Sequence, residues 1–266
     1  RNYSILDESE AETILKGAIQ ARDPKFIKTK NNPKPKVLKN LISYARNTRT
    51  SVRDEAGDRY PFLDGMEEKA EAFHKDYQKA KLEQQVVDYD DLLEYFLGLL
   101  QKNPEIAAHY QNRFKHILVD EFQDTNSIQY AWLRVLAGDA IPVIAVGDDD
   151  QSIYGWRGAK IENIQRFTQD FMGTQTVRLE QNYRSTKTIL DAANGVISHN
   201  AGRLGKDLWT DGEDGEPIKL YSGFNEQDEA RFIVEQIQSW TDEGNPRKSS
   251  AILYRSNAQS RVIEEA

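Results

Sequence analysis

The chain contains no cysteine, and this absence excludes disulfide bonds and thiolate metal sites. It has only four histidines in 266 residues, and their scattered positions argue against a zinc site. No apolar run approaches the roughly 18–20 residues of a membrane-spanning helix, and the N-terminus lacks the apolar core of a signal peptide. We therefore expect a cytoplasmic protein with no membrane partner.

The composition is 38% apolar and 29% charged, which is typical of a soluble globular protein with two or more domains. A net charge of −8 argues against indiscriminate binding of nucleic acid. The charge is uneven, however, because residues 22–53 (the basic segment) contain ten Lys or Arg and a single acid, Asp23. This segment is either a local phosphate-binding surface or a solvated loop and helix face.

The pattern of apolar residues divides the chain into three regions. The first, residues 1–85, is predicted to be helical and without strands. Asp7 and Glu10 are spaced as a capping box at the start of its first helix. A loop is expected over 57–65, followed by a charged helix over 67–85. We expect this region to form an all-helical domain.

From residue 86 the pattern alternates between helices and short apolar strands. Helices are predicted over 88–100, 104–114 and 127–138, and strands over 116–120 and 141–148. Such alternation indicates a parallel sheet covered on both faces. Because ligands of these sheets bind at the carboxyl ends of the strands, residues 86–176 are predicted to be an α/β domain with a site at that edge.

The third region, residues 177–266, is predicted to be a second α/β domain. Strands are expected within 176–179, 217–221 and 250–254, and helices over 186–199, 226–240 and from 261 onward. Ser185 and Asn225 are the expected N-caps of the first two helices.

Acidic residues follow both strands of the predicted first sheet. "ILVDEFQD" ends its apolar run in Asp120-Glu121, and "IPVIAVGDDD" ends in Gly147-Asp148. One such pair could simply cap a helix, because carboxylates complement the exposed N–H groups of a helix N-terminus. Two acidic strand ends weaken that interpretation. A strand ending in Asp-Glu is what a nucleoside triphosphatase uses opposite its phosphate loop, with Asp holding Mg²⁺ and Glu activating water.

The loop after the second strand adds polar and aromatic residues. Gln151 is an uncharged side chain that can respond to a γ-phosphate. Tyr154, Trp156 and Arg157 combine aromatic rings with a cation in a loop too polar for a core, which suits stacking against unpaired bases. The alternative for Trp156 is an aromatic packed on the rim of its own domain.

Tyr183 and Arg184 directly follow a predicted strand of the third region. An Arg presented across a domain cleft can stabilise charge that develops on a transferred phosphoryl group, and a Tyr can stack on a base. As isolated residues, Arg184 would be interpreted as part of a surface ion pair and Tyr183 as a core aromatic.

Four segments in order carry a resemblance to a known family: "ILVDEFQDTN", "VGDDDQSIYGWRGA", "LEQNYRS" and "ILYRSNAQSR". "VDYDDLL" also matches a segment upstream of the acidic motif. From about Ser4 to its C-terminus the chain resembles the UvrD/Rep/PcrA-type superfamily 1 DNA helicases. The resemblance implies two RecA-like motor domains with ATP between them and 3′-to-5′ movement along single-stranded DNA. It also implies a setting in DNA repair or replication, with unidentified proteins of those pathways as partners.

The resemblance implies roles in nucleotide binding for five residues. Asp120, together with Glu121, would hold Mg²⁺, and Glu121 would also be the catalytic base. Gln151 would couple the γ-phosphate to DNA. Tyr183 would stack on adenine, and Arg184 would be the arginine finger.

The resemblance also implies DNA contacts. The residues that would bind the strand are Tyr154, Trp156 and Arg157, with Arg255 and Asn257 as backbone contacts. Residues 1–85 would be the helical insertion of the first motor domain, which meets the duplex at a junction between single- and double-stranded DNA. The basic segment would then be part of this contact.

One family element is missing from this sequence, namely the phosphate loop G-x-x-x-x-G-K-[ST]. "GRLGKDLW" has Gly-Lys but lacks the required glycine spacing and the Ser/Thr after Lys206. We therefore expect an internal piece of a helicase, inactive as an ATPase in isolation, with unpaired edges in its first sheet. Two other classes stay open: a non-catalytic DNA- or partner-binding module, and a Mg²⁺-dependent nuclease using Asp120, Glu121 and Asp148.

Overall fold

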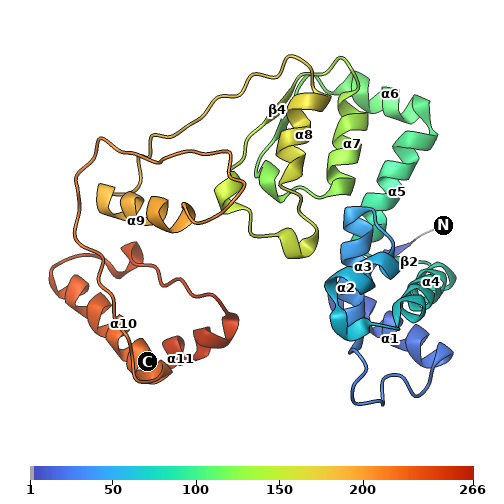
Figure 1. The fold of residues 1–266 in the computed structure, drawn as a ribbon, viewed down its shortest axis with the longest axis horizontal. Coiled ribbons are helices and arrows are strands. Elements are labelled where there is room, and N and C mark those ends of the chain that lie inside the picture. Colours follow the sequence, from blue (N-terminus) through green and yellow to red (C-terminus); the bar gives the residue numbers. More distant parts are fainter. Residues whose placement is uncertain (1–2) are drawn as a thin grey trace. The chain divides into compact units, whose positions relative to one another are not determined.

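The computed structural model describes residues 3–266, apart from the side chain of Phe62. The chain is rich in helices and has short strands (Figure 1). It divides into two units. The first unit contains the residues up to Arg178 and the short segment Gly202–Gly205, and the second contains Leu179–Ala201 and Lys206–Ala266. Among the described helices, none combines the length and apolar character needed to cross a membrane.

The N-terminal part of the first unit is a group of helices closed by a small sheet. Its helices are α1 (Glu8–Arg22), α2 (Pro35–Thr48), α3 (Val52–Arg59) and α4 (Glu67–Gln84). Strand β1 (Ser4–Ile5) pairs in parallel with β2 (Val86–Val87), which joins the two ends of this part. All four helices contribute to one buried core, which includes Ile19, Leu41, Val52 and Phe73. The predicted capping box of Asp7 and Glu10 is confirmed at the start of α1.

Two predictions for this part are wrong. Residues 1–85 do contain a strand, β1, but its two residues are too few to show the alternating pattern of a strand. The predicted loop over 57–65 is shorter than expected, because α3 continues through Gly57 to Arg59. Gly57 is exposed in this helix, and burial of Val52 and Ala56 on the opposite face outweighs its low helical propensity.

The rest of the first unit is an α/β arrangement. Its helices are α5 (Tyr89–Lys102), α6 (Pro104–Arg113), α7 (Ser127–Ala137) and α8 (Glu162–Asp170), and its strands are β3 (Ile117–Val119) and β4 (Val143–Ala145). The two strands are parallel, with Leu118 opposite Ile144, as the sequence predicts. The carboxyl ends of β3 and β4 therefore lie at the same edge, which places the two acidic strand ends next to each other.

Only one face of this two-stranded sheet is covered. Side chains from α7 and α8, including Tyr130, Leu133 and Phe167, pack on it, and Phe122 completes this core. On the other face, Leu118 is 72% exposed and Ile144 is 53% exposed. The prediction of cover on both faces is wrong for the described residues, because alternate side chains of a strand point to opposite faces and α7 and α8 reach only one.

The second unit contains α9 (Lys187–Ile197), α10 (Glu226–Asp242) and α11 (Ser260–Glu265). The strands predicted within 176–179, 217–221 and 250–254 do not form in the described structure. These segments have no regular secondary structure, because a ladder needs a paired partner and only an isolated bridge, between Gln181 and Trp209, is found among the described residues of this unit.

Of the two N-cap predictions for this unit, one is confirmed and one is wrong. Asn225 caps α10 through its side chain, as predicted. The N-cap of α9 is Thr186 and not Ser185. The reason is local, because the backbone N–H of Ser185 donates to Oδ1 of Asn182 and belongs to the preceding turn.

Candidate functional site

The carboxylates at the end of β3, Asp120 and Glu121 (the acidic tip), are exposed and held by a tight turn. Oδ1 of Asp120 accepts the backbone N–H of Glu121 at 2.9 Å. Glu121 has a left-handed backbone conformation, with φ of 49°. This conformation is uncommon for a residue other than glycine, and such strain is concentrated at functional sites.

A buried glutamine joins the two strand ends. Gln123 is 1% exposed; its Nε2 donates to Oε2 of Glu121 at 2.7 Å, and its Oε1 accepts the backbone N–H of Asp148 at 2.9 Å. Position 147 requires glycine, because a Cβ there would lie 2.7 Å from Oε1 of Gln123. Gln123 therefore fixes the orientation of Glu121 relative to the end of β4. Gln123 is not among the site residues predicted from the sequence. Its one local sign there is its place as an amide between the carboxylates of Glu121 and Asp124.

The oxygen atoms at the acidic tip fit a hard divalent cation. Asp120 and Glu121 offer exposed carboxylate oxygens, the ligand type that Mg²⁺ prefers. Oδ1 of Asp124 is buried and has no hydrogen-bond partner among the described residues. Burial, together with the negative charge of Glu121, raises the pKa of Asp124. Positive charge nearby would relieve both effects, so the residues present fit Mg²⁺.

The loop after β4 gathers three further carboxylates, Asp148–Asp150, within 4.8 Å of one another. Their oxygens already have partners in the first unit. Oδ2 of Asp148 accepts Nε2 of Gln151 at 2.7 Å, and Asp149 accepts the backbone N–H of Leu204 at 2.8 Å. Arg203 forms two hydrogen bonds of 2.7 Å to Asp150. This cluster is therefore tied into protein contacts, and Gln151 is held at the same edge of the sheet as Glu121.

Residues 154–158 (the aromatic loop) present two rings and a cation to solvent. The guanidinium of Arg157 lies 4.5 Å from the ring centre of Trp156 and 5.5 Å from that of Tyr154. Trp156 is 59% exposed, so it is not a rim aromatic buried against its own domain. Exposed rings beside a cation can stack on bases and attract phosphates.

The predicted site residues of the second unit are also exposed. Tyr183 and Arg184 leave a turn in which Oδ1 of Asn182 accepts the backbone N–H groups of Arg184 and Ser185 at 2.8 Å. The hydroxyl of Tyr183 donates to Oε1 of Gln181 at 2.7 Å, which leaves its ring face open. Arg255 and Asn257 are both exposed; Asn257 begins the short 3₁₀ helix Asn257–Gln259, and Arg255 lies two residues before it.

The basic segment contains two kinds of side chain. Four are paired: Arg46 lies in a buried ion cluster, Arg22 and Arg53 pair with Asp76 and Glu68 on α4, and Lys39 pairs with Asp88 and Asp90. Six others are exposed and form no ion pair among the described residues: Lys25, Lys28, Lys30, Lys34, Lys36 and Arg49. These six form the part of the segment that is available to phosphates.

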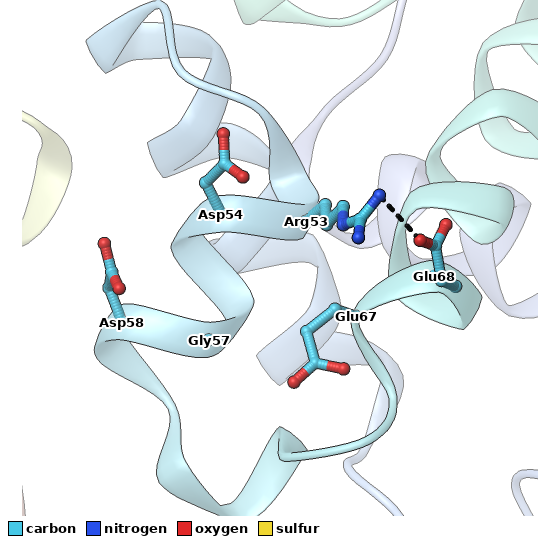
Figure 2. Close-up of a pocket in the computed structure, with 6 residues that line it drawn as sticks. All are labelled: Arg53, Asp54, Gly57, Asp58, Glu67 and Glu68. Carbon is cyan, nitrogen blue, oxygen red and sulfur yellow. Dashed lines mark ion pairs between the residues drawn. The ribbon is translucent and has the colours of Figure 1, made fainter.

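A surface hollow on α3 and the start of α4 is lined by Arg53 of the basic segment but by no residue of the acidic tip or the aromatic loop. Figure 2 shows its lining, which includes Asp54, Asp58 and Glu67. Arg53 is the only cation of that lining, and it pairs with Glu68 at 2.7 Å. Excess negative charge makes this hollow unsuited to a nucleotide or to DNA.

Two protein-family models match this chain. A model described as the UvrD/REP helicase N-terminal domain matches residues 1–172, which is more than half of the chain. The chain belongs to the UvrD/REP helicase family. A second model, the UvrD-like helicase C-terminal domain, matches residues 177–266. The two matched parts are thus helicase domains of the RecA-like superfamily 1 type, as the sequence motifs predict.

Relatives of known name agree with membership in the UvrD/REP helicase family. DNA helicase II of Salmonella typhimurium strain LT2 is 61% identical over 201 residues, which cover 76% of this chain and 28% of that protein. DNA helicase II of Escherichia coli K12 is 60% identical over 201 residues. ATP-dependent DNA helicase PcrA of Staphylococcus epidermidis is 40% identical over 265 residues, 100% of this chain and 35% of that protein. The chain thus spans 28% to 35% of the length of these relatives.

Proposed function

We propose that the protein carrying these residues is an ATP-driven DNA helicase that moves 3′ to 5′ along single-stranded DNA and opens duplexes at junctions. The observation that supports this most is the pair of hydrogen bonds by which Gln123 links Glu121 to the end of β4. A base held at a fixed angle beside a cation-binding carboxylate is what hydrolysis of a nucleoside triphosphate requires. The DNA substrate follows from the relatives, which are named DNA helicases.

The acidic tip supplies the chemistry in this proposal. Asp120 and Glu121 would hold Mg²⁺, and the ion would supply positive charge to neutralise the transferred phosphate. Because Gln123 occupies Oε2 of Glu121, Oε1 is the atom that accepts the proton of the attacking water. Gln151 responds to the γ-phosphate from the end of β4. Tyr183 stacks on the adenine of ATP, and Arg184 stabilises the charge that develops in transfer.

DNA binding is divided between two surfaces in the first unit. The aromatic loop stacks on bases of the single strand, and the six exposed cations of the basic segment contact phosphates near the duplex. Arg255 and Asn257 add backbone contacts. In this proposal residues 1–85 are the helical insertion, 86–176 part of the first motor domain and 177–266 part of the second. We place the protein in the cytoplasm, in DNA repair or replication.

A non-catalytic DNA-binding module is the second candidate. It is supported by the exposed aromatic loop and basic segment, which do not need a nucleotide to bind DNA. The nuclease alternative has less support, because the carboxylates gathered within 4.8 Å in the described residues are Asp148–Asp150 and not Asp120, Glu121 and Asp148.

Phosphate release from ATP, with and without single-stranded DNA, tests the proposal. We expect DNA-stimulated release from the protein when it includes a phosphate loop, and no release from residues 1–266 alone, because acidic carboxylates cannot cradle a triphosphate by themselves. Arg184→Ala is the control for contaminating ATPases and should abolish release. DNA binding without any release in either protein would favour the module. Robust release from residues 1–266 that Arg184→Ala abolishes would show that the phosphate loop is dispensable.

A further inference from the structure

The C-terminal end of α2 contacts the segment that follows the acidic tip. Asn47, 7% exposed, accepts the side-chain N–H of Asn126 on its Oδ1 at 2.8 Å. Asn126 is the N-cap of α7 and is itself 8% exposed. On the other side, Nδ2 of Asn47 donates to Oδ1 of Asp90 at 2.8 Å and to the backbone oxygen of Ser43 at 2.9 Å. Asn47 thus bridges α2, the start of α5 and the start of α7.

The aromatic loop packs on the same end of α2. Gly158 ends this loop with a left-handed φ of 91°, and a Cβ there would lie 3.2 Å from Cβ of Asn47. Directly beyond it, Ala159 pairs with Asn126 in an isolated bridge, and the backbone N–H of Lys160 donates to the oxygen of Thr125 at 3.0 Å. The loop with Trp156 and Arg157 is therefore held between α2 and the segment after the acidic tip.

The end of α2 is itself rigidly held. Arg46, the neighbour of Asn47, is buried with Asp88, Asp91 and Lys81 in an ion cluster that joins α2, α4 and α5. The same helix carries exposed cations of the basic segment at both ends, because Lys36 lies in its first turn and Arg49 is its C-cap. A movement of α2 would therefore be passed to the aromatic loop and to α7 as a unit.

We infer that Asn47 is a positioning residue that couples α2, with its basic segment, to the aromatic loop and the acidic tip. This inference rests on the proposed function. Asparagine is required because the side chain donates to a carboxylate and accepts from an amide at once. Asn47 acts through Asn126 and Gly158, so its loss should leave the chemistry in place and weaken the response of hydrolysis to DNA.

The ratio of DNA-stimulated to basal ATP hydrolysis in the intact protein tests this role. Asn47→Leu should lower that ratio by between about 5-fold and about 150-fold, the usual range for coupling between two sites. The basal rate should stay unchanged. Asn40→Leu is the matched control, because Asn40 lies exposed on the same helix and should leave the ratio unchanged.

An exchange of partners separates positioning from a general loss of structure. Asn47→Asp should lower the ratio, because two carboxylates then face each other. Asn47→Asp combined with Asp90→Asn should restore part of it, because the amide at position 90 can donate to the carboxylate at position 47, which still accepts from Asn126, whereas the bond to the backbone oxygen of Ser43 stays lost. An unchanged ratio in Asn47→Leu would overturn the inference. So would equal falls of the basal and stimulated rates together with a lower thermal midpoint, if the Asn47→Asp and Asp90→Asn double variant restored none of them, because this pattern indicates a general loss of structure. A parent protein with no DNA stimulation would instead overturn the proposed function.

Discussion

Replacing Arg46 with Met should destabilise the helical part of the first unit by about 3–5 kcal/mol, the usual cost of removing one partner from a buried ion pair. Arg46 is 4% exposed and donates to Asp88 at 3.2 Å, Asp91 at 2.6 Å, and both oxygens of Glu94 at 2.9 and 2.7 Å. Met fills much of the volume but leaves Asp91 buried with Lys81 as its close cation, and Asp88 buried with Lys81 at 2.8 Å and Lys39 at 3.9 Å. Glu94 contributes less, because its side chain is 32% exposed and can turn to water.

The titration of Asp88 gives this prediction a pH dependence. Burial alone would raise the pKa of Asp88, but the positive charges of Arg46, Lys81 and Lys39 outweigh burial and hold it well below its ordinary value. A depressed carboxyl pKa stabilises the fold above the unfolded-state pKa, and this stability is lost as the pH falls through the folded-state pKa. In Arg46→Met the pKa of Asp88 should rise, so the variant should lose stability at a higher pH than the parent.

Hydrogen exchange of the amides in α2, α4 and α5 measures this local stability. Arg53→Met is the matched control, because Arg53 also pairs with a carboxylate, but the side chains of Arg53 and Glu68 are 61% and 73% exposed. An exposed pair of this kind contributes about 0–1 kcal/mol, so the control should change exchange little. If Arg46→Met and Arg53→Met had the same small effect, the buried cluster would not stabilise the helical part, and the reasoning would be refuted.

Three further predictions concern DNA binding and acid stability. Trp156→Ala should weaken single-stranded DNA binding by about 1–3 kcal/mol, with an unchanged salt slope, because stacking involves no phosphate; an unchanged affinity would exclude stacking. Lys28→Gln and Lys30→Gln should each reduce the salt slope of DNA binding by about one, and an unaltered slope would exclude these phosphate contacts. Burial, helped by Arg46, lowers the pKa of His74 from 6.5 to about 4. Between these two pKa values the unfolded state binds more protons at this histidine, so the unfolding free energy of the parent falls by up to about 3 kcal/mol as the pH is lowered from 6.5 to about 4. In His74→Phe this fall should be absent. An unaltered dependence of stability on pH would contradict the prediction.

Features set by neighbouring residues could be predicted from the sequence. The capping box of Asp7 and the N-cap Asn225 depend on contacts within three residues, and both are confirmed. The strands β3 and β4 are bounded by turn signals and are confirmed as a parallel pair. The carboxylates of the acidic tip were predicted to end β3, and the structure places them there. Their proposed roles in hydrolysis stay predictions.

Contacts between distant residues could not be predicted in this way. Arg46 counted among the cations of the basic segment, but its carboxylate partners lie 42 to 48 residues further along the chain. The contact of Asn47 with Asn126 spans 79 residues and follows no local pattern. The second unit shows the opposite error, because apolar segments such as 250–254 have the composition of strands but no paired partner in the described residues. Strand composition alone does not supply a ladder.

We propose that Glu121, oriented by Gln123, is the base for ATP hydrolysis. Glu121→Gln tests it most directly, because the substitution keeps the size of the side chain and an oxygen that can accept from Gln123, but removes the basicity. Single-turnover phosphate release should be measured with ATP and single-stranded DNA affinities on the same intact protein. We predict that ATP and single-stranded DNA still bind, with Asp120 as the remaining carboxylate ligand for Mg²⁺, and that release falls by about 10²–10⁴-fold, the usual contribution of a general base. Release at the parental rate would contradict the account and place the base elsewhere.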